Sequence, residues 1–293
     1  MSSNKTPKEI AVKVSVVGMV GNIFLTLFKL IAGIIARSGA VISDAVHSAS
    51  DIFSGLIVIV GVHFSSKDSD SEHPYGHERF ECVAAILLSV VLFLVGGTIG
   101  IAALKSIVTG EYKEISIIGW LGLTAAITSV VVKEAMFWYT IINAKKINSP
   151  ALTAEAWHHR SDALSSVGAI IGIGGAKLGF PILEPIASIT ICLCIIKVSF
   201  RIFKDAIDRM VDHSCDESVE ESIRQCALSV DGVMGVDMLH SRVFGNKIYV
   251  DIEIGADSSM PFTQAHQIAE NVHNAVEESF PQVKHIMVHV NPQ

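Results

Sequence analysis

The sequence predicts a membrane protein with two parts: an all-α domain of six transmembrane helices over residues 1–209 and a smaller α+β domain over residues 210–293. Half of the 293 residues are hydrophobic and only 17% are charged, which is too little polar surface for a wholly soluble protein. The mean hydropathy is +0.50. Long apolar stretches fill the first two thirds of the chain and stop near Met210, where the pattern changes.

Each apolar stretch is at least as long as the roughly 20 residues that a helix needs to cross a bilayer. Backbone inside a bilayer must satisfy its own hydrogen bonds, so we predict that all six stretches are helices. Charged residues precede the first stretch and no early cleavage signal follows it, so we interpret it as a retained span. The predicted spans are Val12–Ala36, Ala40–Ser65, Cys82–Ile107, Ile115–Ile142, Ala151–Leu178 and Phe180–Phe203.

Lysine and arginine are divided unevenly between the two sides of the predicted membrane domain, and the richer side holds both termini. We therefore expect both termini in the cytoplasm and the protein in the inner, cytoplasmic membrane. The formal net charge of −7 argues against a nucleic-acid partner, which needs a basic face. The five cysteines form no CxxC pair, which favours a reducing compartment over a disulfide framework.

The predicted α+β domain is strongly acidic. Residues 211–293 contain 13 acidic and 4 basic residues, a net charge of −9, which raises the local concentration of cations. Its pattern predicts the order α-β-β-α-β of a ferredoxin-like or metallochaperone-like sandwich, and its small size favours dimerisation. The predicted elements are a helix from the capping box Ser218–Glu221 to Leu228, strands Val236–Val243 and Lys247–Ile254 joined at Gly245-Asn246, a helix from Pro261 to Phe280, and a strand His285–Val290.

Two HxxxD pairs lie inside predicted spans: His47 with Asp51 in the second, and His158 with Asp162 in the fifth. Residues four apart share one face of a helix. Two imidazoles and two carboxylates complete a four-coordinate set for Zn²⁺. A lone polar residue at a helix end is often only interfacial, but two identical pairs on different spans are costly in lipid and indicate a metal site.

The motifs Ser43-Asp-Ala-Val-His-Ser-Ala-Ser-Asp51, Glu72-His-Pro-Tyr-Gly-His77 and His158-His-Arg-Ser-Asp162 resemble those of the cation diffusion facilitator family. The resemblance covers nearly the whole chain and is strongest to the bacterial branch that includes magnetosome-type and zinc or iron efflux transporters. It implies a homodimer that expels divalent metal from the cytoplasm, usually in exchange for protons.

A second candidate site lies between the second and third predicted spans, where Asp70, His73 and His77 fall within eight residues. Two imidazoles and a carboxylate can converge on one ion, and Gly76 eases the turn. The alternative is a solvated linker with incidental histidines. The resemblance favours the site, because this cytoplasmic loop can hold a metal in the family.

The resemblance also implies an ion pair between Arg79 and Asp212, which can hold a cytoplasmic gate. In the α+β domain it implies a metal site of Asp251, His266 and His289. Asn291 and Asp251 depart from the pattern of some relatives, which favours a weak, regulatory site shared between two tails over a tight two-metal cluster. Asp237 and His240 are weaker candidates near the first strand, and His273 and His285 are left out of the site as ordinary surface residues.

The leading functional hypothesis is a Zn²⁺/H⁺ antiporter in which zinc is the substrate and also a possible regulator. The alternatives are a transporter of Fe²⁺, Mn²⁺, Cd²⁺ or another divalent metal, since ligand type alone does not exclude these, and a metal sensor or scaffold that transports nothing. An intramembrane metalloenzyme requires a motif such as HExxH, which the chain lacks, so we do not expect an enzyme.

Overall fold

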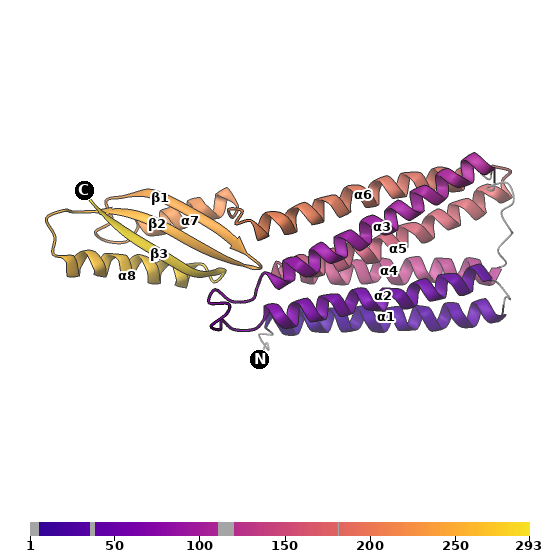
Figure 1. Ribbon diagram of the computed structural model, residues 1–293, viewed down its shortest axis with the longest axis horizontal. Coiled ribbons are helices and arrows are strands. Elements are labelled where there is room, and N and C mark those ends of the chain that lie inside the picture. Colours follow the sequence, from indigo (N-terminus) through magenta and orange to yellow (C-terminus); the bar gives the residue numbers. More distant parts are fainter. Residues whose placement is uncertain (1–5, 36–38, 111–119, 181) are drawn as a thin grey trace. The chain divides into compact units, whose positions relative to one another are not determined.

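The computed structural model describes residues 6–35, 39–110, 120–180 and 182–293; the side chains of some helical residues in these ranges, His47 among them, lie outside the described part. The chain divides into two compact units, Met1–Ala206 and Ile207–Gln293. The described residues form eight helices and three strands, labelled in Figure 1.

The first unit is a bundle of long helices (Figure 1). Four helices of the described chain contain stretches long and apolar enough to cross a membrane: Pro7–Ile35, Phe80–Thr109, Leu123–Ile147 and Pro185–Met210. The prediction of a span is therefore confirmed for these four, and for the second and fifth helices it stays a prediction. The helices are α1 (Pro7–Ile35), α2 (Gly39–Ser65), α3 (Phe80–Thr109), α4 (Trp120–Ile147), α5 (Pro150–Lys177) and α6 (Leu183–Met210).

Large apolar side chains cover the outside of this bundle, and several polar side chains are buried inside it. On α1, Val20, Phe24 and Ile31 are exposed, whereas Ser15 and Lys29 are buried. An apolar surface of this kind is stable only when lipid or protein covers it. The distribution therefore supports a bundle that lies in a bilayer and keeps its polar groups in its interior.

Helix α5 packs against three other helices, α2, α3 and α4. Its first half is lined by small, fully buried residues that let these neighbours approach closely: Ala151, Ala154 and Ala156. This enclosure shields α5 from lipid, and the helix can therefore carry ionisable side chains that an exposed span could not.

The second unit is an α+β sandwich, as predicted. Its elements are α7 (Glu217–Leu228), β1 (Gly235–Phe244), β2 (Lys247–Ala256), α8 (Phe262–Ser279) and β3 (Val283–Pro292). The sheet has the order β1-β2-β3, with β1 antiparallel and β3 parallel to β2. Buried residues of β2 and β3 pack on α7 and α8 to form one core, which includes Ile252, Ile254, Ile286, Ile223 and Val272.

Two predicted turns of this unit have different outcomes. Phe244 pairs with Lys247, and Gly245 has a φ of 63°, so the two-residue hairpin turn is confirmed. The predicted capping box is wrong, because α7 begins one residue earlier and its N-cap is Asp216, with extended backbone and no side-chain cap bond. Aspartate is itself a favoured N-cap residue, which places Ser218 inside the first turn.

Close contact between α3 and α6 depends on two glycines of α3. A Cβ built on Gly96 would lie 2.8 Å from Ile195 Cγ2, and one on Gly100 would lie 2.5 Å from Cys192 Sγ. Gly97, the next residue in the chain, has no neighbouring atom within 4 Å of such a Cβ. Alanine substitutions at Gly96 and Gly97 therefore distinguish the effect of packing from the effect of helix propensity.

We expect Gly96→Ala to lower the stability of the bundle by about 1–3 kcal/mol, because the new methyl group overpacks the contact with Ile195. Gly97→Ala should instead raise it by up to about 1 kcal/mol, because alanine is the better helix former and meets open space. Thermal unfolding of the purified protein in detergent measures both. Equal shifts of the same sign in the two variants would contradict the close α3–α6 contact.

Candidate metal centre

Three helices bring ionisable side chains together in the middle of the bundle. Asp51 comes from α2, Lys133 from α4, and His158 and Asp162 from α5. Asp51, Lys133 and Asp162 each lie near the middle of their helix, and their exposed fractions are 3%, 1% and 7%. Charged groups so deep in an apolar bundle are expensive, which makes them a functional site by default.

The lysine joins the two carboxylates. Lys133 Nζ donates to Asp51 Oδ2 and to Asp162 Oδ2, each at 2.7 Å. One ammonium against two carboxylates leaves an excess of negative charge, so the cluster is complementary to a cation of higher charge. Breaking a buried ion pair by removing one partner costs about 3–5 kcal/mol, so this arrangement holds α2, α4 and α5 in fixed positions.

The imidazole of His158 completes the group. Its Nε2 lies 3.5 Å from Asp51 Oδ1 and 3.2 Å from Ser54 Oγ. One ligand atom from each of Asp51, His158 and Asp162 lies within 4.8 Å of the others, close enough for one metal ion. The fourth predicted ligand, His47, lies on α2, and its side chain is outside the described residues.

Lys133 was not among the predicted site residues. The signal in the sequence is a lysine in the middle of an apolar run, Val130-Val-Val-Lys133. Such a residue can also snorkel or pair elsewhere, and only the packing of α4 against α5 shows where its ammonium lies. The neighbouring Glu134 belongs to a different contact, since its Oε1 lies 3.2 Å from an Arg160 guanidinium nitrogen.

A second polar layer lies beside this centre, where α1, α2 and α5 meet. Glu155 Oε2 accepts a hydrogen bond of 2.9 Å from Ser15, while Glu155 Oε1 and both ring nitrogens of His159 have no hydrogen-bond partner among the described residues. A Cβ on Gly18 would lie 3.3 Å from His159 Nε2 and 3.5 Å from Glu155 Oε1. Buried polar atoms without partners are rare and mark functional sites.

The loop between α2 and α3 brings Asp70, His73 and His77 together, with ligand atoms within 4.8 Å. Asp70 Oδ1 lies 3.4 Å from His73 Nδ1, and Asp70 Oδ2 lies 3.5 Å from His77 Nε2. His77 Nδ1 lies 3.2 Å from the carbonyl oxygen of Asp68, which fixes Nδ1 as the donor and leaves Nε2 free to bind a metal.

The loop geometry also keeps its carboxylate ionised. The backbone N–H groups of His73 and Glu72 both donate hydrogen bonds to Asp70. These bonds lower the pKa of the Asp70 carboxyl, and the bond from His73 has the larger effect. Because the pKa of Asp70 is lowered in the folded loop, these hydrogen bonds stabilise the folded loop at any pH above the ordinary aspartate pKa. This stabilisation is lost as the pH falls through the lowered pKa.

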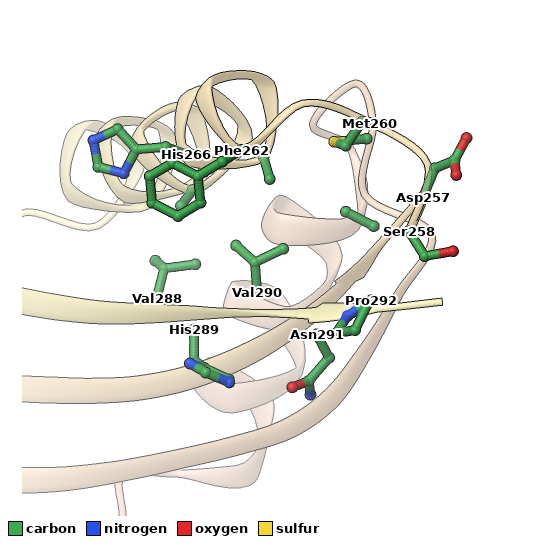
Figure 2. A pocket seen from close by; sticks show the side chains of 13 residues that line it. Asp257, Ser258, Met260, Phe262, His266, Val288, His289, Val290, Asn291 and Pro292 are labelled. Carbon is green, nitrogen blue, oxygen red and sulfur yellow. The ribbon is translucent and has the colours of Figure 1, made fainter.

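The three residues predicted to bind metal in the α+β domain, Asp251, His266 and His289, lie on opposite sides of the sheet. Asp251 pairs with Met287 and Glu253 with His289, which places Asp251 and His289 on the sheet face away from α8. Figure 2 shows His289 on the opposite side of β3 from His266, which lies on α8 beside a pocket of about 460 Å³. The three side chains do not converge within one chain, so a shared metal requires a second copy.

The predicted partners Arg79 and Asp212 lie in different units, Arg79 just before α3 and Asp212 just after α6. Their pairing stays a prediction. Asp212 has a φ of 61°, in the left-handed region that few non-glycine residues adopt.

An apolar bundle that encloses carboxylates and imidazoles, joined to a small acidic sandwich, defines an integral membrane protein with a buried cation centre. Residues 15–211 match the cation efflux transmembrane domain, and residues 215–293 match the cytoplasmic domain of cation efflux proteins. The chain belongs to this cation efflux family, the cation diffusion facilitators, and is a divalent-metal cation efflux transporter.

Three relatives illustrate the breadth of the family. An uncharacterised transporter of Methanocaldococcus jannaschii is 39% identical over 276 residues, which are 94% of this chain and 96% of the relative. The manganese efflux system protein MneP of Bacillus subtilis is 30% identical over 97% of both chains. The magnetosome protein MamM of Magnetospirillum gryphiswaldense is 33% identical over 89% of this chain and 81% of the relative.

We expect Lys133→Met to bind Zn²⁺ at least about tenfold more tightly, or about 1.4 kcal/mol, because no ammonium then competes for the carboxylates. Without metal the same variant should unfold at a lower temperature, because two buried carboxylates lose their counter-charge. Calorimetry and thermal unfolding of the purified protein measure the two effects.

The matched control is Lys29→Met, which removes another buried lysine. Lys29 Nζ donates to Ser48 Oγ at 2.9 Å, whereas the ammonium that joins the two carboxylates is that of Lys133, so we expect Lys29→Met not to raise the zinc affinity. Equal or weaker zinc binding by Lys133→Met would mean that the lysine supports the metal site instead of competing with it.

Proposed function

We propose that this transporter exports Zn²⁺ from the cytoplasm in exchange for protons, and that the metal binds Asp51, His158 and Asp162 together with His47. The observation that carries this proposal is the ion pair at the centre. Two buried carboxylates beside an imidazole already hold a cation, the ammonium of Lys133, at 2.7 Å. A site built to hold a cation deep in the bundle is what an efflux protein needs.

Exchange of cations at the centre follows from its charges. When Zn²⁺ arrives, it displaces the Lys133 ammonium from both carboxylates, because one divalent ion neutralises them more completely than one ammonium. When the metal leaves, the ammonium returns, and the carboxylates are not left unpaired in the apolar interior. The carboxylates are already ionised in this pairing, so the proton exchanged for metal comes from the imidazole of His158 or from the displaced ammonium, and its release couples metal transport to a proton gradient.

Buried polar groups line one approach to the centre. Ser15 and Gly18 of α1, Ser54 and Gly55 of α2, and Glu155 and His159 of α5 all lie toward the end of the bundle where α2 leaves for the loop of Asp70, His73 and His77. We assign this end to the cytoplasm, with both termini, because the lysine and arginine bias predicts it. Metal then passes from the loop trio to the layer of Glu155 and His159, and from there to the centre.

The sandwich serves as a cytoplasmic dimerisation and metal-binding domain over residues 210–293, and the membrane domain covers residues 1–209. The family description of residues 215–293 as a cytoplasmic domain supports this assignment. In a homodimer, the faces that carry Asp251 and His289 can meet a second copy and share a regulatory metal with His266. Arg79 and Asp212 are proposed to pair near the cytoplasmic gate.

Mixed nitrogen and oxygen ligands favour Zn²⁺, whereas a site of carboxylates alone suits Mn²⁺ better. The relative MneP is named a manganese efflux protein, which supports Mn²⁺ as an alternative substrate. His47→Asp should therefore broaden selectivity toward Mn²⁺ and Cd²⁺, since it replaces an imidazole with a carboxylate. Uptake compared metal by metal measures this, and an unchanged profile would remove His47 from the ligand set.

The decisive experiment measures Zn²⁺ uptake into proteoliposomes across a pH gradient. We expect Asp51→Ala and Asp162→Ala to abolish uptake while folding and dimerisation persist, because each removes a carboxylate from the centre. Glu134→Gln is the matched control, since this carboxylate of α4 faces Arg160 and should be dispensable. Wild-type uptake in either aspartate variant would refute the site. Zinc binding without uptake in the wild type would favour a sensor or scaffold.

A further inference from the structure

Three ligand-type side chains converge on the surface of the sandwich and belong to none of the sites described above. They are His273 and Glu277 of α8 and His285 of β3, with one ligand atom of each within 4.8 Å of the others. Glu277 Oε1 lies 3.2 Å from His273 Nε2 and 3.6 Å from His285 Nδ1. The two imidazole rings meet edge to face at 5.5 Å.

The fold positions these groups for a structural reason. His273 and Glu277 are four residues apart on one face of α8. His285 follows the short turn that closes when the Val283 N–H donates to Phe280 O. At this point the β2–β3 register skips a residue, with Ile248 paired to Val283 and Tyr249 to His285. Such irregularities re-aim a side chain, and here the edge strand β3 directs His285 toward α8.

The donor set suits a first-row divalent metal. Two imidazole nitrogens and one carboxylate oxygen supply three ligands, and a water can take the fourth position of a tetrahedral ion. The exposed fractions of His273, Glu277 and His285 are 30%, 34% and 49%, so the ligands can be reached from solvent and bind without deep desolvation. The net charge of −9 over residues 211–293 raises the cation concentration around them.

We infer that His273, Glu277 and His285 form a binding site for a divalent transition metal, for which Zn²⁺ is the probe, and that the bound ion ties the end of α8 to the start of β3. The site is complete within one chain, unlike Asp251, His266 and His289. The surface interpretation of His273 and His285 from sequence did not anticipate the third ligand, because nothing in the spacing of α8 reveals that β3 delivers one.

The chain supplies a matched control on the same helix. His266 and Glu270 have the same spacing of four residues, with His266 Nε2 3.8 Å from Glu270 Oε1, but no third ligand joins them among the described residues. Glu270→Gln therefore removes a carboxylate from a histidine–glutamate pair that is not part of the inferred site. Glu277→Gln makes the same change within the site.

The experiment uses the full-length protein in detergent, and each variant is compared with the unsubstituted protein, so that zinc bound at the other sites cancels. Equilibrium dialysis counts bound zinc, and hydrogen exchange reports on residues 270–290. We expect His285→Ala and Glu277→Gln each to lose one zinc per chain, and Glu270→Gln to lose none. Zinc should slow exchange in residues 270–290 of the unsubstituted protein and of Glu270→Gln, but not of the other two.

An unchanged zinc count together with unchanged protection in both His285→Ala and Glu277→Gln would overturn the inference. Glu277→Gln is close in shape to the native residue and guards against a folding defect in the alanine variant. Neither measurement involves transport, so the result is independent of whether the membrane centre carries zinc.

Discussion

The pairing of one lysine with two aspartates at the middle of the bundle is the constraint on which the membrane unit depends. Lys133 Nζ reaches Asp51 and Asp162 at 2.7 Å, so α4 must stay in contact with both α2 and α5. Charges at this depth are tolerated only when each has a partner. The enclosure of α5 and its small residues follow from this need, because they keep the charged group away from lipid.

The same constraint explains which parts of the architecture the sequence predicts well. Lipid-facing helices must be apolar along their outer face, so the stretches of α1, α3, α4 and α6 are visible as spans without any knowledge of packing. Helices α2 and α5 have apolar stretches that were predicted in the same way, and they carry their ionisable groups inward, where the function lies. The α-β-β-α-β order was also predictable, since turns and alternation are local. The start of α7 was not, because two acceptable N-cap residues compete within three positions.

Some residues of the candidate site could be predicted from local spacing, and others depend on long-range packing. Spacing of four residues indicated that His158 and Asp162 share a face, and the structure places Asp51 beside them. The spacing did not indicate Lys133, whose role depends on how α4 packs against α5. Nor did it indicate the trio on the sandwich, where an irregular register brings His285 to α8. Contacts within one helix can be predicted from residue spacing, whereas contacts between elements can be identified only once their packing is known.

The membrane centre and the trio of His273, Glu277 and His285 differ in what occupies them before metal arrives. At the membrane centre the Lys133 ammonium holds the carboxylates, so an incoming ion gains only the difference between its own binding and that of the lysine. The trio of His273, Glu277 and His285 has no lysine or arginine within its described ion pairs, and its ligands are partly hydrated already. Binding there is therefore not reduced by an internal competitor. A centre that must release its ion benefits from a competing cation, whereas a site that holds α8 to β3 does not need one, and the two donor sets fit these different tasks.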